Sequence, residues 1–328
     1  MKVGVTKSRI VSFLMAMILV IGLLCGCAMK QGNPPRIGIA WRSDTTASSY
    51  IHTVLSVERA GGIPVLLDQV TCTDLQYDNK NSLQGEMEAV GSLSTDAADR
   101  VKNGIWKDSN VKSVMKNIDA VIFTGGEDIS PSLYREPEAW HGIFEEINYN
   151  PTRDVSDYLL MAYCLDKDIP VLGICRGMQM LAVVEGARLV QDIPFWFAEQ
   201  GREYDHLHRY LPGTPEGERD YVPHDVTVLD GSRAMVVTGE EVLSGCPSLH
   251  HQMVFSVEHT GLVVSGFTDT VGVNIIEIVE DPEKTYVMGV QFHPEAAVGK
   301  HAAGEGGSLM PEEVALSFFR GLIMSANQ

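Results

Sequence analysis

The chain has 328 residues, a length that corresponds to one large domain or two small ones. Its 45% hydrophobic and 21% charged residues are typical of a globular protein that buries a core without disulfides or metal. The formal net charge of −18 argues against a nucleic-acid binder, which needs a basic face. Six cysteines are too few for a small disulfide scaffold, and they show no paired C-x-x-C spacing of a zinc site.

The N-terminal segment is organised like an export signal. A basic start precedes a run of 15 apolar or small residues, 10–24, which suits a signal-peptide core and is short for a membrane span. The sequence L-C-G-C at 24–27 then resembles the lipobox of bacterial lipoproteins. This resemblance implies that residues 1–26 are a lipoprotein signal peptide and that Cys27 carries the lipid, so that the membrane is a partner.

Two alternatives for this segment stay open, an uncleaved membrane anchor and a secretory signal cut at another position. All three interpretations place the folded part outside the cytoplasm, at the cell membrane or envelope. Residues 27–35 contain glycine and two prolines and are expected to form a lipidated tether. Residues 36–328 are then expected to form one domain.

Short apolar runs alternate with stretches of helical period through the first half of this domain. Strands are predicted at 36–41, 64–67, 119–124 and 170–174. Helices are predicted at 50–60, 154–165 and 176–185. Strands that alternate with helices in this way predict an α/β fold with a doubly wound, mostly parallel sheet.

The last third of the chain has a different pattern, with strands and few helices between them. These strands are predicted at 222–229, 262–266, 274–279 and 286–291. They favour a small antiparallel extension of the sheet. A final helix is predicted at 312–323, with its apolar residues on one face.

Two connections, residues 68–118 and 191–221, are long for a compact domain. Loops of this length are usually functional or disordered, and loops at the carboxyl ends of parallel strands overlook the ligand crevice. Surface decoration is the alternative for 68–118. We expect trimming of 68–118 to change substrate preference more than stability.

The strongest chemical signal is G-I-C-R-G at 173–177, between a predicted buried strand and a predicted helix. This is the context of a nucleophile elbow, in which the nucleophile occupies a sharp and strained turn. Side chains at Gly173 and Gly177 would collide, so both positions must be small. Cys175 would lie at a helix N-terminus, where the dipole favours a thiolate. The alternative is a buried structural cysteine between two turn glycines.

A nucleophilic cysteine needs a base, and the base needs a group that orients it. The best candidate is His293 in G-V-Q-F-H-P-E at 289–295, after an apolar strand. Pro294 disfavours the α conformation at His293, so we expect an extended chain that places His293 and Glu295 on the same side. Glu295 could then accept one imidazole N–H and leave the other nitrogen for Cys175. The alternative is an ordinary turn.

Together these motifs resemble the class I glutamine amidotransferase-like superfamily, which has a three-layer, flavodoxin-like fold. Three further segments are similar to its gamma-glutamyl-gamma-aminobutyrate hydrolase-like branch: T-G-G-E-D-I-S-P-S-L-Y at 124–134, R-D-V-S-D at 153–157 and H-H-Q at 250–252. The resemblance covers about residues 36–323. One departure is Asp157, which stands where the branch usually has Glu; other departures leave the three candidate catalytic residues unchanged.

The resemblance implies Cys175 as nucleophile, His293 as base and Glu295 as the residue that orients it. It further implies Gly126 and Arg176 as backbone donors of an oxyanion hole. The remaining residues implied in substrate binding are Gly125, Gln179, Arg153 and His250. Arg153 and His250 would match the charges of a free amino acid group, or would instead be ordinary surface or core residues.

The activity implied is hydrolysis of gamma-glutamyl amide or peptide bonds through a thioester, releasing glutamate and an amine, without metal or organic cofactor. One alternative is a glutaminase subunit of an amidotransferase, disfavoured by export; another is a non-catalytic envelope binding protein. His206, His208 and His224 fit no strong metal template and are expected to be ordinary loop histidines. Cys72, Cys164 and Cys246 are expected to have no catalytic role.

Overall fold

The computed structural model describes residues 33–328 except 105 and 211–220. The predicted signal peptide and Cys27 therefore lie outside the described residues. One compact unit runs from Pro35 to Gln328. Within the described ranges, every helix is too short or too polar to span a bilayer.

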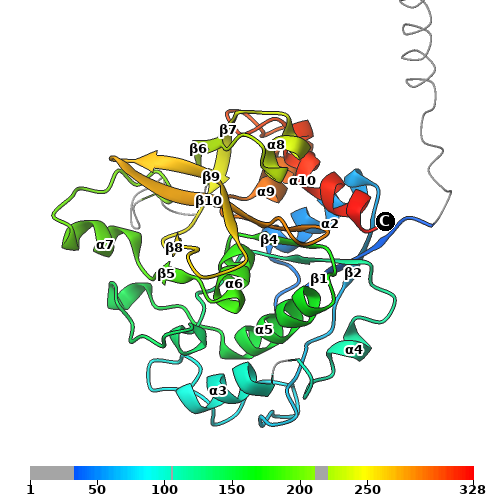
Figure 1. The fold of residues 1–328 in the computed structure, drawn as a ribbon, viewed down its shortest axis with the longest axis vertical. Coiled ribbons are helices and arrows are strands. Elements are labelled where there is room, and N and C mark those ends of the chain that lie inside the picture. Colours follow the sequence, from blue (N-terminus) through cyan, green and yellow to red (C-terminus); the bar gives the residue numbers. More distant parts are fainter. Residues whose placement is uncertain (1–32, 105, 211–220) are drawn as a thin grey trace, which may run out of the picture. The chain divides into compact units, whose positions relative to one another are not determined.

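Half of the central nine-stranded sheet is parallel, as the alternating pattern predicts (Figure 1). Its strands are, in spatial order, β2 (Ile63–Leu66), β1 (Arg36–Ile39), β3 (Ala120–Phe123), β4 (Val171–Ile174) and β11 (Val287–Val290). All residues of β3, β4 and β11 are buried, which explains their continuous apolar sequences. Parallel strands end at the same edge, so the chain leaves all three at one place.

Helices cover both faces of this parallel half. One layer contains α2 (Ser48–Ala60), α9 (Pro294–Ala302) and α10 (Glu312–Ser325), which pack against one another. The other contains α5 (Pro151–Asp166) and α6 (Arg176–Glu185). Two separate apolar cores correspond to the two faces. The doubly wound α/β fold is therefore confirmed.

The antiparallel half is larger than the sequence predicts. After β11 the sheet continues with β10 (Val273–Asp281), β9 (Val263–Thr270), β6 (Val222–Val228) and β7 (Val242–Ser248). Strand β7 was missed because its sequence V-L-S-G-C-P-S contains glycine and proline, which usually indicate a loop. A separate ribbon joins β5 (Arg188–Val190) to β8 (Met253–Ser256).

The long connections also contain helices that the sequence did not reveal. Residues 68–118 include α3 (Thr95–Gly104) and α4 (Val111–Val114), and two single 3₁₀ turns follow at Pro131–Leu133 and Phe144–Glu146. Residues 191–221 include α7 (Ile193–Glu199). A further short helix outside these connections, α8 (Arg233–Thr238), was also not predicted. All are short, and short helices carry little periodicity.

Residues 68–118 are part of the core and not decoration. Apolar side chains throughout the segment, including Leu75, Leu83, Leu93 and Val101, are buried in the same cluster as α5 and α6. This burial argues against the expectation that trimming would change substrate preference more than stability, because trimming would expose one side of the main core.

This burial predicts the effect of shortening one side chain. Leu93→Ala removes a fully buried side chain and should lower the free energy of unfolding by ~2–5 kcal/mol in urea denaturation. Val90→Ala, three residues earlier at a side chain that is 44% exposed, should change it by no more than about 0.5 kcal/mol. Equal effects of the two variants would show that the segment packs loosely.

Candidate active site

Cys175 lies in a strained turn between β4 and α6. Its φ of 51° and ψ of −106° are unusual for a residue with a side chain. A Cβ at Gly173 would lie 2.6 Å from the carbonyl carbon of Gly177, and a Cβ at Gly177 would lie 2.3 Å from the carbonyl oxygen of Phe123. Both glycines are therefore required, as predicted, although Gly177 is constrained by the neighbouring strand β3. The geometry is that of a nucleophile elbow.

His293 and Glu295 are in contact, as predicted, but the reason given from the sequence was wrong. His293 Nδ1 lies 2.7 Å from Glu295 Oε1. The chain does not stay extended, because α9 begins at Pro294 and Glu295 belongs to its first turn. Proline is favoured at the first position of a helix, where its missing N–H has no intrahelical partner. Backbone angles of −112° and 79° at His293 direct its ring toward the carboxylate.

The ends of β3, β4 and β11 bring the catalytic candidates together. A Cβ at Gly125, just after β3, would lie 2.7 Å from His293 Cε1 and 3.5 Å from Cys175 Cβ. Within the described ranges, the buried Nε2 of His293 has no hydrogen-bond partner. That nitrogen is therefore left for the thiol, and Gly125 allows the close approach of the two side chains.

The surroundings of His293 favour its protonated form. Burial alone lowers the pKa of this imidazole, but the Glu295 carboxylate and Cys175 outweigh burial and hold the pKa well above its usual range. A carboxylate on Nδ1 and a thiolate near Nε2 both stabilise an imidazolium. The arrangement thus provides an acid that can protonate a leaving group.

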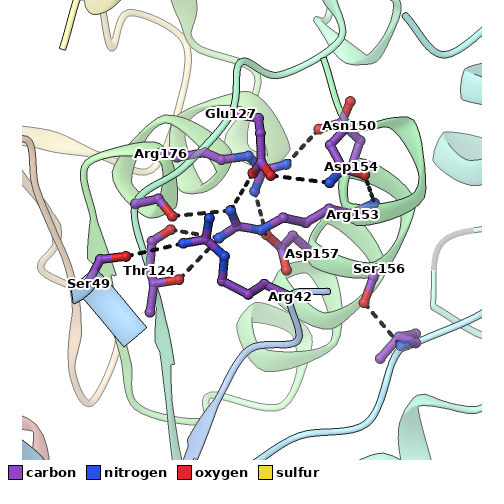
Figure 2. Close-up of polar contacts among 12 residues, drawn as sticks. Arg42, Ser49, Thr124, Glu127, Asn150, Arg153, Asp154, Ser156, Asp157 and Arg176 are labelled. Carbon is purple, nitrogen blue, oxygen red and sulfur yellow. Dashed lines mark hydrogen bonds and ion pairs between the residues drawn. The ribbon is translucent and has the colours of Figure 1, made fainter. Parts of the chain in front are cut away.

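Arg153 is completely buried, and its guanidinium faces Thr124 and Glu127 (Figure 2). Its guanidinium donates to the carbonyl oxygens of Gly125 at 3.1 Å and Thr124 at 2.9 Å and to Glu127 at 2.7 Å. The expectation that Arg153 contacts substrate is therefore wrong, because its nitrogens are directed at the protein. Burial acts to raise the pKa of Glu127, but the charges of Arg153 and Arg176 and the hydrogen bonds to the carboxylate together outweigh it and lower that pKa to about 2.

The side chain of Arg176 is buried in the same network. It donates to Asp154 at 2.6 Å and to Asp157, both on α5, and Asp157 also contacts Arg153 (Figure 2). Asp154 in turn accepts from the backbone of Ser130. The motif R-D-V-S-D therefore links α5 to the start of α6 and to the loop after β3. Removing one member would leave an uncompensated buried charge.

This network fixes the peptide between Gly125 and Gly126. All described peptide bonds are trans, so the C=O of Gly125 and the N–H of Gly126 point in opposite directions. Since the carbonyl accepts from Arg153, the N–H points away from the guanidinium, as an oxyanion donor must. A Cβ at Gly126 would lie 2.0 Å from Arg153 Nη1, so only glycine fits. The N–H of Arg176 belongs to the first turn of α6, where no intrahelical acceptor exists.

Two other predicted substrate-binding residues have protein partners. Gln179 lies on α6, and its Nε2 is 3.3 Å from Gln291 Oε1 and 3.4 Å from the carbonyl oxygen of Gln252. Both ring nitrogens of His250 face protein groups, with Nδ1 2.7 Å from the Gln252 carbonyl oxygen and Nε2 3.7 Å from Glu277 Oε1. Direct substrate contact through His250 is thus an expectation that the structure contradicts.

Some residues at or near the site were missed or misjudged from the sequence. The ring of Tyr221 lies 5.1 Å from that of His293, and nothing in its sequence context signals this. Glu277 is fully buried in β10 and contacts His208 and His224, which are not ordinary loop histidines. A single acid within the apolar sequence N-I-I-E-I-V was a signal that could have identified Glu277. His206 lies apart and packs on Tyr204.

The remaining described cysteines have no part in the site. Cys72, Cys164 and Cys246 are free and buried. Burial raises the pKa of each thiol, which makes it unreactive.

The raised pKa of His293 predicts the effect of removing its partner. Glu295→Gln takes away the carboxylate that favours the imidazolium, so the pKa of His293 falls and the alkaline limit of kcat/KM moves to lower pH by about 1–3 pH units. Glu305→Gln, at an exposed glutamate beyond α9, should leave the pH profile unchanged. An unchanged profile in Glu295→Gln would show that Glu295 does not tune the base.

Comparisons with known proteins identify the family of the chain. The family model described as Peptidase C26 matches residues 104–295, more than half of the chain. The solved structure of a glutamine amidotransferase from Thermotoga maritima is 14% identical, covers 90% of this chain and 100% of its own, and superposes with a TM-score of 0.47.

Three curated relatives each match a little over half of the chain. Rv2859c of Mycobacterium tuberculosis, which carries a provisional glutamine amidotransferase name, is 34% identical over 58% of this chain and 54% of its own. The glutamine amidotransferase-like protein YvdE of Lactococcus lactis is 29% identical over 58% and 71%. Gamma-glutamyl-gamma-aminobutyrate hydrolase of Escherichia coli O157:H7 is 29% identical over 57% and 68%. This chain thus spans about half the length of the first relative.

Proposed function

The chain belongs to the Peptidase C26 family, within the class I glutamine amidotransferase-like proteins, and on this premise we propose that it hydrolyses gamma-glutamyl amide or peptide bonds. Membership supports hydrolase activity in general. The observation that carries the finer proposal is the position of Cys175 at a strained elbow beside His293, whose Nδ1 is fixed on Glu295.

The proposed reaction has two halves. The Cys175 thiolate forms a C–S bond with the gamma-carbonyl carbon, and the N–H groups of Gly126 and Arg176 stabilise the oxyanion. The C–N bond breaks as His293 gives its proton to the leaving amine. His293 then removes a proton from water, whose oxygen forms the new C–O bond as the C–S bond breaks. Amide and water become glutamate and an amine, and the thiolate is restored.

The name of the E. coli relative supports a gamma-glutamyl substrate. The buried positions of Arg153 and His250 do not support either as the group that binds the substrate's alpha-carboxylate. Glutamine itself is the second candidate substrate, because several relatives have glutamine amidotransferase names. The rates of glutamate release from glutamine and from gamma-glutamyl amines, measured under the same conditions, distinguish the two candidate substrates. A higher rate with glutamine would favour a glutaminase.

We also propose that the enzyme works outside the cytoplasm, held at the membrane by lipid on Cys27. This proposal rests on the L-C-G-C sequence at 24–27 and the apolar run before it. A small gamma-glutamyl compound would then be its main partner besides the membrane. An exported enzyme of this kind would not meet cytoplasmic synthetases, which disfavours a role as an amidotransferase subunit.

The nucleophile is tested by glutamate release from gamma-glutamyl-p-nitroanilide by the purified full-length protein. Cys175→Ala should reduce kcat by at least ~10³-fold, because no other group can form the thioester. Cys72→Ala is the matched control, since it removes a buried thiol outside the site, and it should retain activity. If the unsubstituted protein cleaves no gamma-glutamyl compound, the non-catalytic binding protein is favoured instead.

The anchor is tested by palmitate labelling in a bacterial host. Cys27→Ser should lose both the label and the membrane association, because thioether attachment needs the cysteine sulfur. Cys25→Ser, two residues earlier in the same segment, should keep both. Labelling that persists in Cys27→Ser would contradict lipidation at this residue.

A further inference from the structure

Three histidines and one glutamate form a buried cluster that the proposed hydrolysis does not use. Glu277 lies on β10 and His224 on β6, while His208 precedes β6 and His250 follows β7. None is more than 5% exposed. The cluster thus joins four segments of the antiparallel half that are far apart in sequence.

Each histidine directs one ring nitrogen at the Glu277 carboxylate. His208 Nδ1 lies 3.2 Å from Oε1, His224 Nε2 lies 3.9 Å from Oε2, and His250 Nε2 lies 3.7 Å from Oε1. Among the described residues, none of these three nitrogens and neither oxygen of Glu277 forms a hydrogen bond of good geometry, although each nitrogen lies at ion-pair distance from the carboxylate. Buried polar atoms are rarely left so, because an unsatisfied group costs ~1–3 kcal/mol.

The other nitrogen of each ring is held by a fixed neighbour. His250 Nδ1 lies 2.7 Å from the Gln252 carbonyl oxygen, and His208 Nε2 lies 2.9 Å from Thr270 Oγ1. His224 Nδ1 lies 3.1 Å from Thr268 Oγ1. Histidines that bind metal ions usually donate their second N–H to such oxygens, which fixes the tautomer and the ring orientation.

These outer contacts determine which inner nitrogens carry a lone pair. A carbonyl oxygen only accepts, so His250 carries its proton on Nδ1 and Nε2 faces Glu277 with a lone pair. Thr268 donates its hydroxyl proton to the Asp225 carbonyl oxygen at 2.8 Å, and therefore accepts from His224 Nδ1. His224 Nε2 is then also a lone pair directed at a carboxylate. With neutral imidazoles, two lone pairs would face the carboxylate. A bound cation, or a second proton on an imidazole, would satisfy all three groups.

We propose that His208, His224 and Glu277 hold a divalent metal ion of the zinc type, and that His250, whose Nε2 lies 3.7 Å from Glu277 Oε1, moves in as the fourth ligand. Ligand atoms of the first three lie within 4.8 Å of one another. Tetrahedral Zn²⁺ with bonds of about 2.0–2.1 Å would place its ligand atoms about 3.3 Å apart. The distances from the histidine nitrogens to the nearer Glu277 oxygen, 3.2–3.9 Å, are close to or above that value, so the site would contract around the ion.

The site would be structural, because four protein ligands leave no open position for a reacting water. It would stabilise the segments that hold the catalytic base. The carbonyl oxygen of Glu277 accepts from the backbone of Gln291 at 2.8 Å, and that of Pro247 accepts from the backbone of His293 at 2.8 Å. The metal would thus hold in place the strands whose backbone is hydrogen-bonded to Gln291 and His293, without contacting substrate. The inference is independent of the proposed hydrolysis.

Metal content of the purified full-length protein tests the proposal directly. After incubation with Zn²⁺ and gel filtration, elemental analysis should find one ion per chain. Substitution by Co²⁺ should give the intense visible absorption of a tetrahedral site. Chelation should lower Tm, and Zn²⁺ should restore it. No retained Zn²⁺ or Co²⁺ and an unchanged Tm would overturn the proposal.

Variants separate this site from adventitious binding. His224→Gln and Glu277→Gln should lose the stoichiometric ion, whereas His206→Asn should keep it, because His206 lies two residues from His208 but outside the cluster. Asparagine suits the positive φ of 56° at that position. Should a cluster variant fail to fold, the chelation experiment on the unsubstituted protein still decides. Equal retention by all three variants would contradict the assignment.

Discussion

The whole site depends on one steric constraint, the convergence of three parallel strands at a point that leaves no room for side chains on the glycines there. β3, β4 and β11 end side by side, and the chain turns sharply at Cys175 with a positive φ. Gly125, Gly173 and Gly177 each face an atom less than 3 Å from where a Cβ would be. This crowding forces the sulfur and the imidazole together, and the strain at Cys175 is a local cost that the packed sheet sustains.

Buried ion pairs stabilise the arrangement that this steric crowding produces. Two fully buried guanidinium groups, those of Arg153 and Arg176, are matched by Glu127, Asp154 and Asp157. The network holds the loop after β3 by its carbonyl oxygens, so the opposite N–H groups remain for an oxyanion. Preorganised donors of this kind need no rearrangement during the reaction. The buried charges therefore position the backbone, and the side chains of Arg153 and Arg176 are enclosed by protein.

The sequence predicted the parts of this arrangement that are encoded locally. The elbow at Cys175 follows from two glycines between a buried strand and a helix, and the parallel half follows from alternating patterns. The contact between His293 and Glu295 was predicted for the wrong reason, since Pro294 starts a helix. Contacts between segments that are distant in sequence could not be predicted from the sequence. Arg153, for example, has the positive charge expected of a residue that binds a carboxylate, and only the structure shows that protein groups enclose it. The cluster around Glu277 likewise joins residues from 208 to 277.

The central claim is that Cys175 forms a covalent gamma-glutamyl thioester. The most direct measurement is an acid-quenched reaction of the purified protein with a gamma-glutamyl amide, followed by peptide mass spectrometry. The account predicts the added mass of one gamma-glutamyl group on the peptide that contains Cys175, and its disappearance as turnover ends. Turnover without this adduct in the presteady state, or an adduct on another residue, would contradict it.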